Sequence, residues 1–111
     1  PYRCTAKLPT KREVRFDIAD LSMNGVGLRS KDQSLGEGLQ IGTVLTGATL
    51  DFRKEGTVTS DLMVTFLRSS QSTSNTVYHI GCRFLNLPRA KERDLQRLIT
   101  YLELARRDGK N

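Results

Sequence analysis

A short polar stretch between two apolar runs, DLSMNGVGL (Asp20–Leu28), carries the residues best suited to chemistry. An ionised aspartate only accepts hydrogen bonds, so Asp20 suits a base edge rich in N–H donors, such as N1 and N2 of guanine. Ser22 can donate to a phosphate or to a base atom. Gly25 and Gly27 have no side chains, which lets a flat ligand approach the backbone closely. The stretch therefore has the parts of a polar pocket for a nucleotide.

The same stretch also fits a turn that binds nothing. Ser22 and Asn24 favour a turn, and we expect Gly25 to supply a positive φ before the next strand begins at Val26. Composition alone leaves both interpretations open.

The sequence lacks the combinations of residues that enzymatic catalysis usually requires. The single histidine, His79, lies in the middle of an expected strand, and the sequence places no nucleophile beside it. Cys4, Cys82 and His79 do not have the spacing of a zinc site, and no phosphate-loop or dinucleotide-fold motif is present. We therefore predict that the chain is not an enzyme and holds no metal.

Short strands are the elements expected to position the polar stretch. From residue 2 to residue 86, apolar and polar residues alternate and are interrupted by Gly, Asn, Ser and Asp clusters, which is typical of an all-β unit. Residues 43–52 and 57–67 should form an antiparallel hairpin, and residues 76–85 the last strand. We predict a mainly β fold, a six-stranded antiparallel barrel.

Two polar stretches interrupt the strands. Residues 31–42 contain three glycines, and residues 68–75 form a low-complexity run rich in serine. Both are predicted to be loops, and neither resembles a domain linker.

The apolar period changes from two to about 3.6 residues after Pro88. The apolar residues that follow lie on one side of a helix: Leu95, Leu98, Ile99, Leu102 and Ala105. This stripe predicts one amphipathic C-terminal helix over about residues 88–107. Acidic residues are interleaved with the basic ones on this helix, so packing against the barrel is favoured over binding to a membrane or to nucleic acid.

The bulk properties indicate a single domain. The chain has 111 residues, of which 37% are hydrophobic, and no apolar run approaches the roughly 18 residues of a membrane-spanning helix. We predict no membrane insertion. Cys4 and Cys82 are far apart in strand-like sequence and are expected to be free core thiols, which fits a reducing cytoplasm.

The net charge of +6 raises the alternative of a small basic barrel that binds nucleic acid. Such barrels place aromatic side chains on an outer face to stack bases. All four phenylalanines instead fall at positions expected to face the interior, which makes nucleic acid an unlikely partner: Phe16, Phe52, Phe66 and Phe84.

The motif Asp20-x-Ser22-x-x-Gly25, after a strand and before V-G-L, resembles the D/N-x-S-x-x-G signature of PilZ domains. The start PYRCTAKL and the close IGCRFLNLPRAKERDLQRLITYLELARR are most similar to the PilZ domain of YcgR-type flagellar brake proteins. The resemblance implies one PilZ domain over residues 1–111, a six-stranded barrel that binds cyclic di-GMP on its outside, and no other cofactor. It implies ligand contacts from Asp20, Ser22 and Gly25. Weaker candidates are Asn24, Gly81, Arg83 and Arg29, for which a solvated role is the alternative.

The resemblance also implies a function. The chain would be the receptor module of a cytoplasmic protein that acts at the flagellar basal body, has a further domain upstream, and controls motility through ligand-induced domain rearrangement and contact with flagellar motor proteins. The alternative is a PilZ domain that binds proteins and no nucleotide.

One departure concerns the R-x-x-x-R motif that accompanies the PilZ signature ahead of the first strand. Lys11–Arg15 and Arg3–Lys7 have the spacing with one lysine each, but both pairs fall within the first two expected strands. We expect the arginines to lie upstream of Pro1 in the whole protein. Two hydrogen bonds to charged groups contribute about 3–6 kcal/mol, so the 111 residues alone should bind cyclic di-GMP weakly or not detectably.

Overall fold

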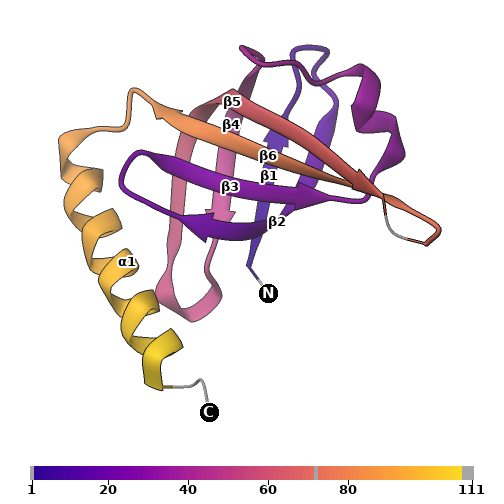
Figure 1. The fold of residues 1–111 in the computed structure, drawn as a ribbon. Coiled ribbons are helices and arrows are strands. Elements are labelled where there is room, and N and C mark those ends of the chain that lie inside the picture. Colours follow the sequence, from indigo (N-terminus) through magenta and orange to yellow (C-terminus); the bar gives the residue numbers. More distant parts are fainter. Residues whose placement is uncertain (1, 72, 109–111) are drawn as a thin grey trace.

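The structure, a computed structural model, describes residues 2–71 and 73–108. Six strands form a closed antiparallel barrel in the order β1-β2-β3-β6-β5-β4, with one helix beside it (Figure 1). The strands are β1 (Arg3–Lys7), β2 (Glu13–Leu21), β3 (Gly25–Ser30), β4 (Val44–Asp51), β5 (Thr57–Gln71) and β6 (Thr76–Leu85). The helix is α1 (Arg89–Asp108), and two short 3₁₀ helices are η1 (Gln33–Glu37) and η2 (Arg53–Glu55). The predicted fold class is confirmed.

The barrel interior is filled by the apolar side of the alternating strands. Phe16 on β2 and Leu62 on β5 are among the side chains with almost no exposed surface, and each such burial contributes about 1.5–3 kcal/mol. Cys4 and Cys82 are also buried in this core, and both are free thiols, as predicted.

The stretch predicted as the loop 31–42 contributes two side chains to the hydrophobic core. It contains η1, and its Leu35 and Leu39 side chains are buried in the barrel core. Asp32 caps η1 by accepting a hydrogen bond from the Ser34 N–H at 3.0 Å, and it pairs with the Arg12 guanidinium at 2.9 Å. The two leucines are part of the hydrophobic core, which the polar composition around them concealed.

The loose loop predicted over residues 68–75 was too long, because residues 68–71 belong to β5. β5 continues to Gln71 and β6 begins at Thr76, with Gln71 and Thr76 as register partners. Their backbone ladder needs no apolar side chains, because an antiparallel hairpin can expose polar residues to water. The two strands form the long arm that extends from the barrel in Figure 1.

The helix α1 packs against the barrel as predicted. It starts after Pro88, whose carbonyl accepts hydrogen bonds from the N–H groups of Lys91 and Glu92 at 2.9 and 3.2 Å. Leu95 and Leu98 are buried in the barrel core. No helix among residues 2–71 and 73–108 is long and apolar enough to cross a membrane.

Candidate functional site

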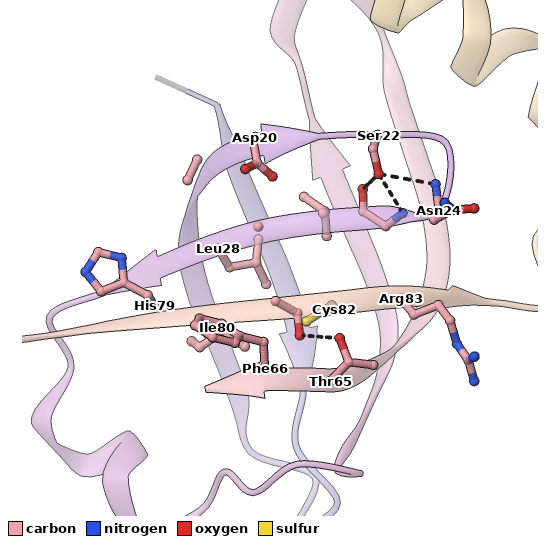
Figure 2. Close-up of a pocket in the computed structure, with 15 residues that line it drawn as sticks. Asp20, Ser22, Asn24, Leu28, Thr65, Phe66, His79, Ile80, Cys82 and Arg83 are labelled. Carbon is pink, nitrogen blue, oxygen red and sulfur yellow. Dashed lines mark hydrogen bonds between the residues drawn. The ribbon is translucent and has the colours of Figure 1, made fainter. Parts of the chain in front are cut away.

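A groove of about 500 Å³ runs over the outer face of β2, β3, β6 and β5 (Figure 2). Arg29 is not among the residues that line it. The lining does include the other ligand contacts predicted from the sequence: Asp20, Ser22, Asn24, Gly25, Gly81 and Arg83. The structure therefore brings the β2–β3 turn and the middle of β6, about 60 residues apart in the chain, to one surface.

The floor of the groove is made of two glycines that face each other on neighbouring strands. Gly27 on β3 pairs with Gly81 on β6, with Asp20 of β2 beyond Gly27 and Phe66 of β5 beyond Gly81. A methyl group on Gly27 would lie 2.6 Å from Asp20 Oδ1, and one on Gly81 would lie 3.0 Å from Phe66 Cβ. The carboxylate and the aromatic side chain thus lean over a floor without side chains.

Two β-bulges, one in β2 and one in β5, turn the Asp20 and Phe66 side chains outward. In β2, Ile18 pairs with Leu28 and Asp20 with Gly27, which leaves Ala19 as an extra residue. A bulge of this kind shifts the alternation of side chains by one position. Strict alternation would turn Asp20 inward like Phe16, which lies four residues earlier on β2. Because of the bulge, Asp20 is exposed instead.

The second bulge acts in the same way on β5. Val64 pairs with Cys82 and Phe66 with Gly81, so that Thr65 is the extra residue. Phe66 is 51% exposed, and the prediction that it faces the interior was wrong. The adjacent apolar pair Phe66-Leu67 was the available signal, because it breaks the alternation.

Ser22 holds the turn that presents Asp20. Its hydroxyl oxygen accepts hydrogen bonds from the N–H groups of Asn24 and Gly25, both at 3.3 Å (Figure 2). The Asn24 carbonyl in turn accepts a hydrogen bond from the Phe84 N–H at 2.9 Å. The Ser22 O–H points to the Gly25 carbonyl at 3.4 Å, a long contact that a ligand atom could replace.

Gly25 is required for a different reason from the one predicted. Its φ is outside the positive range, so the prediction of a left-handed turn residue was wrong. A methyl group at this position would lie 1.8 Å from the Cys82 carbonyl oxygen on β6. Gly25 therefore permits the close pairing of β3 with β6 that forms the groove.

Basic side chains lie at both ends of the groove. Arg83, the register partner of Gly25, lines one end, and its guanidinium points away from the centre in Figure 2. His79 lines the opposite end, next to Arg29 in register. Partial burial, followed by the charges of Arg68 and Arg29, lowers the pKa of His79 below its ordinary value.

Neither of the two basic pairs with the R-x-x-x-R spacing reaches the groove. Arg3 forms an ion pair with Asp17 at 3.1 Å. Lys11 is in the turn between β1 and β2, outside the strand predicted for it, and lines a separate hollow together with Lys7. Among residues 2–71 and 73–108, no cluster of three or more His, Cys, Asp or Glu side chains could hold a metal ion.

The family of the chain follows from a comparison with known domains. The PilZ domain model matches residues 1–101. The chain belongs to the PilZ family. This PilZ domain is 42% identical over 108 residues to flagellar brake protein YcgR 1 of Paraburkholderia phytofirmans, and 41% identical over 106 residues to flagellar brake protein YcgR of Cupriavidus taiwanensis.

Each alignment with these two relatives covers 96% of the PilZ domain described here, but only 42% and 39% of the relatives. The chain thus spans about two fifths of their length. Its fold is also similar to that of the PilZ domain of YcgR from Escherichia coli, solved with c-di-GMP, with a TM-score of 0.80 and 28% identity. That match covers 100% of this chain and 88% of the solved one.

Proposed function

We propose that this PilZ domain is a receptor for cyclic di-GMP and that its groove holds one guanine of the ligand. The observation that carries the proposal is the placement of Asp20 and Phe66 on either side of the floor made by Gly27 and Gly81. Guanine presents N1 and N2 donors on its edge, which suit an acceptor-only carboxylate. Its flat face suits an exposed aromatic ring and a floor without side chains.

Relatives support the same ligand. The E. coli YcgR PilZ domain, solved with c-di-GMP, aligns with the full length of this chain. The groove contains the full Asp20-x-Ser22-x-x-Gly25 motif. In our proposal Asp20 binds the guanine edge, Ser22 keeps the turn in shape and donates to the ligand, and Gly25 keeps β3 and β6 close. Asn24, Gly81 and Arg83 contribute the turn, the floor and one basic end.

The whole protein would complete the site with an R-x-x-x-R motif upstream of residue 1. Arginine binds guanine O6 and N7 through two donors, and two hydrogen bonds to charged groups contribute about 3–6 kcal/mol. This corresponds to roughly two to four powers of ten in Kd. The chain alone should therefore bind the ligand weakly, and a form extended upstream should bind it much more tightly.

At the level of the whole protein, we propose a flagellar brake that acts in the cytoplasm at the flagellar basal body and has no enzymatic role. A ligand held by both the upstream arginines and the barrel would shift the equilibrium between domain arrangements by its differential affinity for them. The rearranged protein would then contact the flagellar motor.

Titration calorimetry with cyclic di-GMP tests this proposal on the 111-residue chain and on an extended form. We expect weak binding by the chain, binding tighter by at least about a hundredfold in the extended form, and a loss in Asp20→Ala. Submicromolar binding by the chain would contradict the role of upstream arginines. No binding by either form would indicate a PilZ domain that serves protein interaction alone.

The exposure of Phe66 also makes the nucleic-acid alternative worth a direct test. A single exposed phenylalanine is a small stacking surface, since Phe16 and Phe52 are buried in the core and single-strand binding usually uses successive aromatics. Salt-dependent binding of single-stranded DNA that is unchanged in Asp20→Ala would favour that alternative.

A further inference from the structure

Three basic or titratable side chains form a row across the barrel surface beside the groove. Arg29 on β3 is the register partner of His79 on β6, and His79 is the partner of Arg68 on β5. Arg29 and Arg68 are exposed, and His79 itself lines the groove. We call Arg29, His79 and Arg68 the basic row.

Carboxylates do not balance the basic row. Asp17 on β2 is the register partner of Arg29, but its carboxylate is ion-paired with Arg3 at 3.1 Å. Within the described part of the chain, Arg29 and Arg68 take part in no ion pair. Like charges at neighbouring cross-strand positions are unfavourable by themselves, so the row favours an anion.

The environment of His79 indicates how the repulsion between like charges in the basic row is reduced in the free protein. The charged groups that face it are Arg29 from β3 and Arg68 from β5, and its Nε2 lies 3.2 Å from the Ser70 hydroxyl. Desolvation and the two guanidinium charges lower the pKa of the ring. His79 is therefore mainly neutral near pH 7 until an anion approaches.

The basic row lies next to the floor of the groove. The floor consists of Gly27, Gly81 and the base of Phe66 at successive register positions, and the basic row is two residues further along each strand. That step is about 6.6 Å, which is comparable with the separation between a guanine ring and the phosphate of its own nucleotide. A base on the floor would thus place a phosphodiester within reach of His79.

We propose that the basic row is a second anchoring point, where Arg29, His79 and Arg68 bind a phosphodiester of the dinucleotide whose guanine occupies the groove, and that His79 takes up a proton when the ligand binds. The inference rests on the proposed function. It adds a phosphate site on the barrel itself, separate from the upstream arginines. It also makes ligand binding depend on pH.

The direction of the pH dependence follows from linkage. A phosphodiester beside His79 favours the charged imidazolium and raises its pKa from the lowered value of the free protein. Between the two pKa values, the ring is protonated in a larger fraction of the complex than of the free protein. Affinity for the ligand therefore increases as the pH falls, by about three- to tenfold between pH 8 and pH 5.5.

Proton NMR tests the inference on this chain, because its one histidine gives an unambiguous titration curve. With cyclic di-GMP at millimolar concentration, the pKa of His79 should rise, and the backbone amides of the Asp20–Gly27 stretch should shift. If the amides shift while the His79 pKa stays the same, the inference fails and the proposed function stands. If nothing shifts in this chain or in the form extended upstream, the proposed function fails, and this inference with it.

Variants distinguish a specific contribution of the basic row from nonspecific attraction by the positive charge of the chain. His79→Gln should still bind but lose the pH dependence, and Arg29→Gln combined with Arg68→Gln should weaken binding by about 2- to 30-fold. Arg97→Gln, an exposed arginine on α1, is the matched control and should bind like the unaltered chain. Retention of the pH dependence in His79→Gln, or unchanged affinity in the double variant, would overturn the inference.

Discussion

The Asp20 carboxylate and the Phe66 ring lie on opposite sides of one groove floor, and each is turned outward by a β-bulge in its own strand. The two strands are separated in the barrel by β3 and β6. Gly27 and Gly81 keep the space between them open. The site thus depends on two irregularities of an otherwise regular barrel.

Removing the charge of Asp20 should weaken ligand binding without unfolding the barrel. Asp20→Ala removes the carboxylate, and a hydrogen bond to a charged group contributes about 1.5–3 kcal/mol. We expect a 10- to 150-fold increase in Kd for cyclic di-GMP, on the order given by that energy, measured by calorimetry. Asp94→Ala on α1 removes a charge outside the groove and should have no effect; an equal effect in both variants would argue against a specific contact.

Phe66 should contribute through its ring. Loss of a base–aromatic stack costs about 1–3 kcal/mol, so Phe66→Ala should weaken cyclic di-GMP binding by roughly 5- to 150-fold. Its side chain is 51% exposed, so thermal stability should change little. Tyr101→Ala, a 50% exposed aromatic on α1, provides the control. Unchanged binding in Phe66→Ala would place the base elsewhere.

Gly25→Ala and Gly27→Ala should fail in different ways. At Gly25 the new methyl group meets the Cys82 backbone carbonyl at 1.8 Å, so the β3–β6 pairing must shift and stability should fall by about 3 kcal/mol. At Gly27 it meets the Asp20 side chain at 2.6 Å, which can rotate away. Gly27→Ala should therefore remain folded but bind poorly, as thermal unfolding and calorimetry on both variants would reveal.

The buried thiols predict a loss of stability at alkaline pH. Burial raises the pKa of Cys4 from 9.0 to about 12, with a further contribution from Cys82, and burial raises that of Cys82 to about 12. Above pH 9 the unfolded chain loses thiol protons that the folded chain retains. The free energy of unfolding should fall as the pH rises from about 9 to 12, by up to about 1.4 kcal/mol per pH unit for each thiol.

Urea unfolding at a series of pH values measures this slope. Stability should be independent of the thiols below pH 9. Cys82→Ala should remove about half of the thiol contribution to the slope. An unchanged slope in that variant would show that other groups cause the alkaline loss.

The regular parts of the structure were predictable from the sequence. Alternation along residues such as Val14 and Phe16 indicates inward-facing strands, and the spacing of Leu95 and Leu98 indicates a helix packed on the barrel; both pairs are buried. These patterns survive because each depends on local periodicity alone. The polar turn around Ser22 was also recognisable, since its residue types are characteristic.

The irregular parts were not predictable in the same way. The bulges at Ala19 and Thr65 arise from how strands pair, which is a property of two distant segments together. They decide that Phe66 faces the groove, and simple alternation placed it inside. The role of Gly25 likewise depends on the Cys82 carbonyl of another strand, which the local sequence does not contain.

The most direct test of the account is a ¹H–¹⁵N NMR titration of this chain with cyclic di-GMP, since it detects weak binding and locates it. We expect saturable shifts at Asp20, Ser22, Gly27, Phe66 and Gly81, with α1 largely unaffected. Shifts confined to surfaces away from this groove, or none at millimolar ligand in either this chain or the form extended upstream, would contradict the claim that the groove between Asp20 and Phe66 binds the nucleotide.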